Sequence, residues 1–472
     1  MWSENLTENY RIERDSLGSL EVAVHLNYGV HTVRSLHNFP FQGERMHPYL
    51  IQAIVLVKKA AALTHLHNGE LASEKADAII KACDQILENF DIDDFPVSRM
   101  QGGAGTSTNM NVNEVVANRA LQILGHEKGD YQYLHPVDDV NLGQSTNDVY
   151  PTALRIAIIR LLREVSQIFA DLQQALQHKE NEFADIIKLG RTQWMDALPI
   201  MLGQEFGAYA QAISRDRWRI YKVEERLRQV NIGGTAIGTG LNATRNYYFK
   251  MIENLRQLSK IGLARAEYPI DVTQNQDIFV EVSGLLKAAS VNLFKISNDI
   301  RTMASGPKGG LGELKLKPLQ AGSSIMPAKV NPVMPEMMIN VSLKIQANDS
   351  LISQAASSGT FELNPFLPLI GEALMESLQL LKDAIPVYIT GCIEPLKADA
   401  DRCRQLLECS SVLVTALVPY IGYDRAAEIG KKALQNNMTI KEVLVADKVL
   451  PIETIDSILN PLQLTKPGIA GK

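Results

Sequence analysis

Four short polar segments contain the side chains that could do chemistry. Each is rich in glycine, serine, threonine or asparagine, and they read GSSIMPAKVNP (322–332), QGGAGTSTNMNVNE (101–114), DDVNLGQSTND (138–148) and GRTQWMD (190–196). One such segment alone is typical of a helix cap or a turn, because short polar side chains accept the free N–H bonds at helix N-termini. Four of them, with one lysine among them, predict a binding site for a small dianion.

The lysine-containing segment combines features of a flexible loop with features of a rigid one. Gly322 allows the backbone to approach closely, whereas two prolines fix the backbone angle φ. We expect this geometry to direct the N–H groups of Ile325 and Met326 at Ser323. Such donors, with Lys329 as a nearby cation, would stabilise a serine alkoxide and so make it a base. The preceding residues, KLKPLQAG, would let the segment close over a substrate as a lid.

Long helical patterns predict the elements that position these segments. An amphipathic pattern covers 70–90, and four longer runs exceed the usual ~8–20 residues of a globular helix. Several of these runs are apolar on more than one face, which indicates burial on most sides. The pattern predicts a helical bundle whose helices also pack against other subunits. The four runs are 150–188, 202–230, 278–305 and 336–358.

The predicted fold is all-α, with a long central helical bundle flanked by smaller, mostly helical domains at both ends. We predict an N-terminal domain over 1–145, a central bundle over 146–395 with a catalytic loop at 315–332, and a C-terminal helical domain over 396–472. The stretch NYGVHTVRSLHNFP contains a glycine and ends at a proline, so we expect it to be irregular.

Composition narrows the functional classes. The 472 residues are 46% hydrophobic and 21% charged, and the net charge of -6 gives no basic surface for nucleic acid. The N-terminus lacks the pattern of a signal peptide, and the most apolar stretch is broken by Lys58 and Lys59, so we expect no membrane span. The four cysteines predict buried thiols of a reduced, cytoplasmic protein. The histidine spacing predicts no metal, and we expect no cofactor.

The quoted motifs also carry a resemblance. GSSIMPAKVNPVMPE resembles the signature loop of the aspartase/fumarase superfamily, and GAGTSTNMN, QSTND, GRTQ and GGTAIGTGLN (233–242) match it in order. The resemblance covers nearly the whole chain. Within the superfamily the chain is most similar to the aspartate ammonia-lyase branch. Fumarases typically read GSGTQSNMN where this chain reads GAGTSTNMN, and they typically have Thr-His where this chain has Thr192-Gln193.

The resemblance implies a reaction and a role for each site residue. The reaction is the reversible deamination of L-aspartate to fumarate and ammonia, with Ser323 as the general base that takes a proton from Cβ. The α-carboxylate would be held by Lys329, Asn331 and Thr192. The β-carboxylate would be held by four hydroxyl groups, those of Thr106, Ser145, Thr146 and Ser324. The amino group would lie near Asn147, Gln193 and Thr106, and Glu336 would lie behind Gln193. The resemblance also implies a homotetramer in which three chains share each active site.

The chain departs from the family pattern at a few positions, which keeps alternatives open. Gly143, Trp194 and Met195 replace more usual residues, and EVAVHLNYG replaces a more usual EVPADAYYG. Trp194 and Met195 adjoin Gln193 and could reshape the amine side of the pocket, or they could be neutral changes on a helix face. The alternatives are a hydratase like the class II fumarases, an amine-lyase for another succinate derivative, and an inactive structural homologue such as a lens crystallin.

Overall fold

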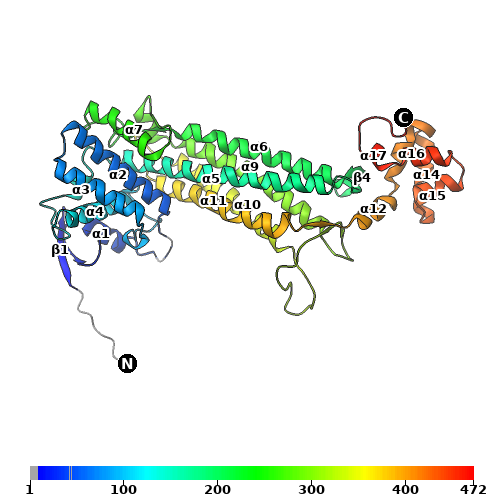
Figure 1. Cartoon of the computed structure of the whole chain (residues 1–472), viewed down its shortest axis with the longest axis horizontal. Coiled ribbons are helices and arrows are strands. Elements are labelled where there is room, and N and C mark those ends of the chain that lie inside the picture. Colours follow the sequence, from blue (N-terminus) through cyan, green and yellow to red (C-terminus); the bar gives the residue numbers. More distant parts are fainter. Residues whose placement is uncertain (1–8, 42, 44) are drawn as a thin grey trace. The chain divides into compact units, whose positions relative to one another are not determined.

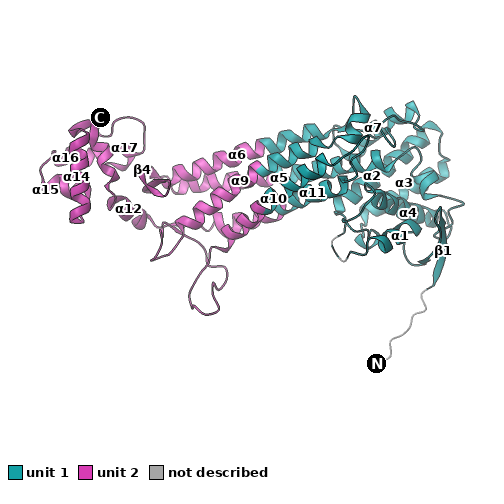
Figure 2. Cartoon of the chain, turned by 180° about the vertical axis from the view of Figure 1, so that it is seen from behind, with its two compact units in different colours: residues 1–166, 219–287, 344–380 teal, residues 167–218, 288–343, 381–472 magenta. Residues whose placement is uncertain are grey.

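Helices dominate the computed structural model, which describes residues 9–41, 43 and 45–472 (Figure 1). The chain forms two compact units (Figure 2). Unit 1 contains the chain up to residue 166 with 219–287 and 344–380, and unit 2 contains 167–218, 288–343 and 381–472. The predicted boundaries between three domains stay a prediction. The two units meet within the long helices and do not coincide with those boundaries.

Five long helices form the bundle, and each passes from one unit into the other. They are α5 (Thr146–Glu182), α6 (Leu202–Leu227), α9 (Asp277–Met303), α10 (Val333–Ser357) and α11 (Leu367–Tyr388). The first four confirm the predicted long helical runs, and α11 is an addition to them. Polar contacts tie the helices together within each unit: in unit 1 the Ser283 hydroxyl donates to Asp349 at 2.9 Å, and in unit 2 the Ser297 and Tyr388 hydroxyls lie 3.0 Å apart.

Unit 1 surrounds its share of the bundle with shorter elements. Strands β1 (Tyr10–Asp15) and β2 (Gly18–Ala23) form an antiparallel hairpin, and β5 (Gln229–Val230) pairs in parallel with β6 (Ala264–Arg265). The helices are α1 (Val30–Asn38), α2 (Pro48–Asn68), α3 (Ser73–Glu88), α4 (Thr106–Ile123), α7 (Arg245–Ser259) and α8 (Pro269–Gln274), with short turns η1 (Ile92–Asp94) and η2 (Pro136–Val140). Helix α3 confirms the amphipathic helix predicted over 70–90.

Helix α1 lies where we expected irregular chain, so that expectation was wrong. The carboxylate of Glu114, on α4, accepts hydrogen bonds from the backbone N–H groups of Gly29, His31 and Thr32 and from the Thr32 hydroxyl. These N–H groups belong to the first turn of α1, which has no capping side chain of its own. A distant carboxylate therefore supplies the cap that the local sequence lacks.

Helix α2 corrects the expectation that no apolar stretch is long enough to cross a membrane. Its 21 residues pass that test by length and hydropathy, although 72% of the apolar window is buried within the structure. Lys58 and Lys59 do not interrupt it, since Lys58 is fully buried and Lys59 pairs with Asp84. Within the structure, α2 is a core helix.

Unit 2 places a second hairpin against the C-terminal helices. Strands β3 (Ile187–Thr192) and β4 (Met195–Met201) are antiparallel, and β7 (Leu314–Lys315) pairs with β8 (Lys397–Ala398). Ile187, Leu189 and Met201 belong to one apolar cluster with the helices that follow residue 399. These are α12 (Ala400–Glu408), α13 (Val418–Ile421), α14 (Tyr423–Asn436), α15 (Ile440–Ala446), α16 (Ile452–Ile458) and α17 (Pro461–Leu464), with the short helix η4 (Ser411–Leu417). Another short helix, η3 (Ile389–Ile393), directly follows α11.

The cysteines follow the sequence prediction with one exception. All four are free, and Cys83, Cys392 and Cys403 are buried. Cys409, directly after α12, is exposed, so the prediction of four buried thiols was wrong for this residue.

Candidate active site

The hydroxyl oxygen of Ser323 accepts two backbone hydrogen bonds. The N–H of Ile325 donates to it at 3.1 Å and the N–H of Met326 at 3.0 Å. This confirms the geometry expected from the sequence. Two N–H dipoles that converge on one oxygen stabilise negative charge there, which a serine needs if it is to act as a base.

Residues 322–331, which we call the Ser323 loop, are closed at the neck by their own hydrogen bonds. The N–H of Gly322 donates to the carbonyl of Lys329 at 2.8 Å, and the side-chain amide of Asn331 donates to the carbonyl of Gly322 at 2.7 Å. A Cβ added at Gly322 would lie 2.5 Å from the Lys329 carbonyl oxygen. Glycine is therefore required at this position, because the two ends of the loop approach each other closely there.

The tip of the Ser323 loop is open to solvent in the single chain. The side chain of Ile325 is 83% exposed, and those of Met326, Val330 and Lys329 are exposed as well. Ser324 and Glu336 are also exposed, the latter in the first turn of α10. Apolar side chains at the tip of a loop favour contact with another surface.

The N-termini of two helices meet in unit 1 and present a second group of site residues. Thr106 is the first residue of α4 and Thr146 the first residue of α5. The side chain of Asn109, one turn into α4, donates to the Thr146 hydroxyl at 3.3 Å. Because the positive ends of both helix dipoles lie here, the arrangement suits a carboxylate.

Residues 145–148, the Ser145 turn, are fixed by a buried carboxylate. One oxygen of Asp148 accepts from the N–H of Ser145 at 2.9 Å, and the other accepts from Gly233 and Thr235 at 3.0 Å each. The side chain of Asn147 donates to the carbonyl of Ala236 at 2.8 Å. The turn is thereby joined to the glycine-rich segment 231–244, which we call the glycine loop. Burial raises the pKa of Asp148 to about 6, and the three N–H donors oppose that rise.

A buried lysine stands behind this group. The ammonium of Lys58, on α2, donates to the side-chain oxygens of Asn141 and Gln144 at 2.8 and 2.9 Å. The same Asn141 oxygen accepts from Asn109 and from Asn113 at 3.2 Å each. Burial lowers the pKa of Lys58 to about 7, against the attraction of Asp148. Sequence reasoning took Lys58 only as a break in an apolar run, although a lysine inside such a run is itself a signal of a buried polar network.

Thr192 and Gln193 lie at the tip of the β3–β4 hairpin, and not at a helix cap as the GRTQWMD segment alone suggested. Gln193 and Trp194 form the two-residue turn with φ of 54° and 67°. Positive φ at both central positions is the type I′ geometry that matches the twist of the strands. Trp194 and Met195 are 74% and 69% exposed at this tip, so the alternative that placed them on a helix face was wrong.

Strand β3 of this hairpin is held by a buried ion cluster. The guanidinium of Arg191 donates to both oxygens of Glu313, at 2.9 and 3.0 Å, and the ammonium of Lys188 lies 3.3 Å from the same carboxylate. Lys188 also contacts Glu205 at 2.9 Å. Glu313 is completely buried and comes directly before β7, from which the chain continues to the Ser323 loop. The cluster therefore fixes the hairpin and the start of the loop segment at one point.

The structure gathers the expected site residues into separate groups. Unit 1 holds Thr106, Ser145, Thr146 and Asn147 together at the ends of α4 and α5. Unit 2 holds Thr192 and Gln193 on the hairpin, and Ser323, Ser324, Lys329 and Asn331 on the Ser323 loop. Among the described residues, no group of three His, Cys, Asp or Glu side chains is arranged to hold a metal ion.

Comparison with known families identifies the chain. A family model described as a lyase matches residues 18–347, and a model of the fumarase C C-terminus matches 413–466. The chain belongs to this lyase family. Its curated relatives include a protein of a Bacillus species named aspartate ammonia-lyase, 44% identical over 99% of this chain and 100% of the relative. A protein of the same name from Bacillus subtilis is 42% identical, covering 99% of this chain and 98% of its own length.

Solved structures agree with the family assignment and the helical bundle fold. A structure described as fumarate lyase:delta crystallin from Brucella melitensis bound to cobalt superposes with a TM-score of 0.95 at 44% identity, over 97% of this chain and 100% of that one. A class II fumarase from Schistosoma mansoni superposes with a TM-score of 0.92 at 33% identity, again over 97% and 100%. The all-α bundle expected from the sequence is confirmed.

Proposed function

We propose that the chain is an aspartate ammonia-lyase, a carbon–nitrogen lyase that converts L-aspartate reversibly to fumarate and ammonia. The observation that carries the proposal is the pair of N–H bonds that the Ser323 oxygen accepts. The substrate is supported by the names of relatives that match nearly the whole chain.

The proposed first step moves a proton from Cβ of aspartate to the Ser323 oxygen. The electron pair of the broken C–H bond passes into the β-carboxylate, which becomes an enediolate with two negative oxygens. Catalysis requires donors that bind this charge more tightly than they bind the substrate. In the second step the pair returns to form the Cα–Cβ double bond, the C–N bond breaks, and ammonia leaves with fumarate.

Each remaining site residue has a proposed role in binding the dianion. The added charge on the β-carboxylate is met by the hydroxyls of Thr106, Ser145, Thr146 and Ser324. Lys329, Asn331 and Thr192 hold the α-carboxylate, with Lys329 as the only cation of the Ser323 loop. Asn147 and Gln193 lie at the amino group with Thr106, and Glu336 supports Gln193 from behind. The reaction needs no cofactor and no metal in this proposal.

We also propose a homotetramer in which three chains complete each active site. One chain would provide Thr106 and the Ser145 turn, a second the hairpin tip, and a third the Ser323 loop. Exposed apolar side chains on the bundle helices support this assembly, because they would lie in water in a single chain. They include Val291 on α9, Leu343 on α10 and Val387 on α11. The net charge of -6 and three buried thiols support a cytoplasmic enzyme without a nucleic-acid or membrane partner.

An ultraviolet assay for fumarate tests the proposed function. The purified protein is incubated separately with L-aspartate, with L-malate, and with fumarate plus ammonium. We expect fumarate to form from aspartate and to be consumed with ammonium, with no turnover of malate. Turnover of malate alone would assign a hydratase, and turnover of none of them would exclude aspartate as the substrate.

A further inference from the structure

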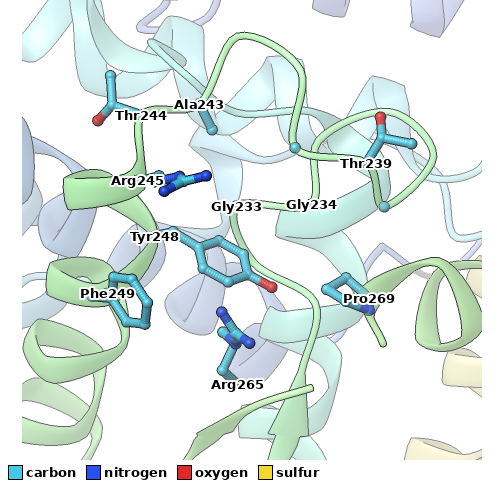
Figure 3. A pocket seen from close by; sticks show the side chains of 12 residues that line it. Gly233, Gly234, Thr239, Ala243, Thr244, Arg245, Tyr248, Phe249, Arg265 and Pro269 are labelled. Atoms are coloured by element: carbon cyan, nitrogen blue, oxygen red, sulfur yellow. The ribbon is translucent and has the colours of Figure 1, made fainter. Parts of the chain in front are cut away.

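A cavity of about 480 Å³ lies beside the glycine loop (Figure 3), and none of the residues that line it belongs to the proposed active site. Its walls come from the glycine loop, the start of α7, and the residues at β6 and α8. A volume of this size is in the range of sites for small ligands. The cavity lies wholly within unit 1.

Two arginines give the cavity a positive wall. The guanidinium of Arg265 lies 4.8 Å from the ring centre of Tyr248 and 5.5 Å from that of Phe249. Arg245 directs its guanidinium into the same space from the first turn of α7 (Figure 3). No carboxylate within the described part of the chain forms an ion pair with either arginine. The rings position Arg265 without using its N–H donors, which remain available for an anion.

The opposite wall is formed by backbone at glycine positions where no other residue would fit. Gly233 and Gly238 have φ of 85° and 89°. A Cβ added at Gly233 would lie 2.3 Å from the Tyr248 ring, and one added at Gly238 would lie 2.5 Å from the backbone of Ile270. Glycines required in this way let the loop pack closely against its neighbours and leave this wall without side chains.

The glycine loop also carries the partners of the Ser145 turn. Gly233 and Thr235 donate their N–H groups to Asp148, and Asn231 donates its side-chain amide to the carbonyl of Asn147 at 3.0 Å. Gly233 thus lines the cavity and holds the turn at the same time. A movement of the glycine loop is therefore transmitted to the Ser145 turn, because the bonds from Gly233 and Thr235 to Asp148 are buried.

We propose that this cavity is a second binding site, for a small dianion with carboxylate or phosphate groups, and that its occupancy is transmitted through the glycine loop to the Ser145 turn. The arginine pair supplies the charge and the hydrogen-bond donors, and the aromatic rings form an apolar side that accommodates a short carbon chain.

Isothermal titration calorimetry with two probes tests the site directly. Inorganic phosphate and succinate are titrated separately, at low salt, into the whole protein carrying Lys329→Ala, which removes the cation of the proposed active site. We expect one dianion per chain to bind, and we expect Arg265→Gln or Arg245→Gln in this background to weaken binding by about tenfold or more. The probe that binds more tightly identifies whether the natural ligand is a phosphate compound or a dicarboxylate.

A matched control removes charge from the same helix outside the cavity. Lys250 on α7 pairs with Glu253 and does not line the cavity, so Lys250→Gln is expected to leave the affinity unchanged. An equal loss with Lys250→Gln, or binding that survives Arg265→Gln, would overturn the proposed site. Heat of binding does not depend on turnover, so failure of the aspartate assay would leave this result intact.

Hydrogen exchange tests the transmission. In the same background, the probe is expected to slow amide exchange in peptides that cover 231–240 and 144–150, and Arg265→Gln is expected to abolish both effects. Protection of 231–240 alone would show that the cavity binds the probe but does not reach the Ser145 turn, which would overturn that half of the proposal.

Discussion

The Ser323 loop and the Ser145 turn, which we propose to be two parts of one active site, are held in shape in opposite ways. The hydrogen bonds that shape the Ser323 loop join residues of the loop itself, at its neck and at its serine. The Ser145 turn has a local bond from Ser145 to Asp148, but it is also fixed by partners from α4 and the glycine loop, which are distant in sequence. Changes in the loop should therefore affect chemistry with little effect on folding, whereas changes behind the turn should affect both.

The largest effect is expected from Ser323→Ala. The variant loses the two bonds to the serine hydroxyl, but the neck bonds do not involve that hydroxyl, so the neck of the loop should stay closed. Turnover of aspartate should fall by about 10²–10⁴-fold, the usual contribution of a positioned base, and the thermal unfolding midpoint should not change. Fumarate absorbance and a thermal melt measure the two quantities. A variant that keeps more than about a third of the activity would show that Ser323 is not the base.

A smaller loss is expected from Lys329→Ala. It removes the one cation of the Ser323 loop, so kcat/KM should fall by about ten- to a hundredfold, as for a charged hydrogen bond. Lys329→Arg should not restore it, because a planar guanidinium does not replace a compact ammonium. Steady-state kinetics of the two variants separates these outcomes, and recovery with arginine would mean that only the net charge matters.

In the buried ion cluster that holds the β3–β4 hairpin, Glu313→Gln should reduce folding stability as well as activity. It leaves Arg191 and Lys188 facing a neutral amide in a fully buried place. Breaking a buried pair of this kind costs about 3–5 kcal/mol, which urea denaturation would measure. Glu428→Gln is the matched control in the same unit, because its partner Arg425 is exposed and the change should cost under about 1 kcal/mol. Equal effects of the two variants would refute a structural role for the buried cluster.

The smallest effect concerns the pH dependence of the Ser145 turn. The folded protein raises the pKa of Asp148 from 3.8 to about 6, so the folded state binds this proton more tightly than the unfolded state does. Its contribution to stability is full below about pH 4 and is lost as the pH rises through about 6. The stability of the wild type relative to Asp148→Asn should thus fall by up to about 3 kcal/mol between pH 4 and pH 7. Urea denaturation at both pH values tests this, and a rise would contradict the assignment.

The parts of the molecule that the sequence predicted are those with local causes. The long helices follow from apolar periodicity, and the N–H bonds to Ser323 follow from a glycine and prolines within ten residues of one another. Helix α1 was not predicted, because its N-terminal N–H groups are satisfied by Glu114, which is 85 residues from Gly29. The β3–β4 hairpin was not predicted either, since Gln193 and Trp194 lack the Asn-Gly signal of such turns and the strands pack on helices that follow residue 399.

The site was predictable as a set of residues but not as an arrangement. Motif segments named Thr106, Ser145 and Thr146. The side chain that contacts Thr146 is Asn109, which lies in a quoted motif but was given no role, and the lysine that holds the neighbouring Asn141 and Gln144 is Lys58, which lies in no motif. Which chains complete one site stays a prediction, because it depends on contacts between subunits.

Mixing two inactive variants tests the shared site most directly. Thr106→Ala and Ser323→Ala each spoil every site alone. The two proteins are unfolded together, refolded so that chains associate at random, and assayed for fumarate, with mass measurement to confirm mixed tetramers. If Thr106 and Ser323 of one site come from different chains, about one quarter of the sites receive both intact residues, and activity should return to as much as roughly a quarter of the wild-type value. A mixture of confirmed mixed tetramers that stays as inactive as its parents would show that both residues belong to one chain's site.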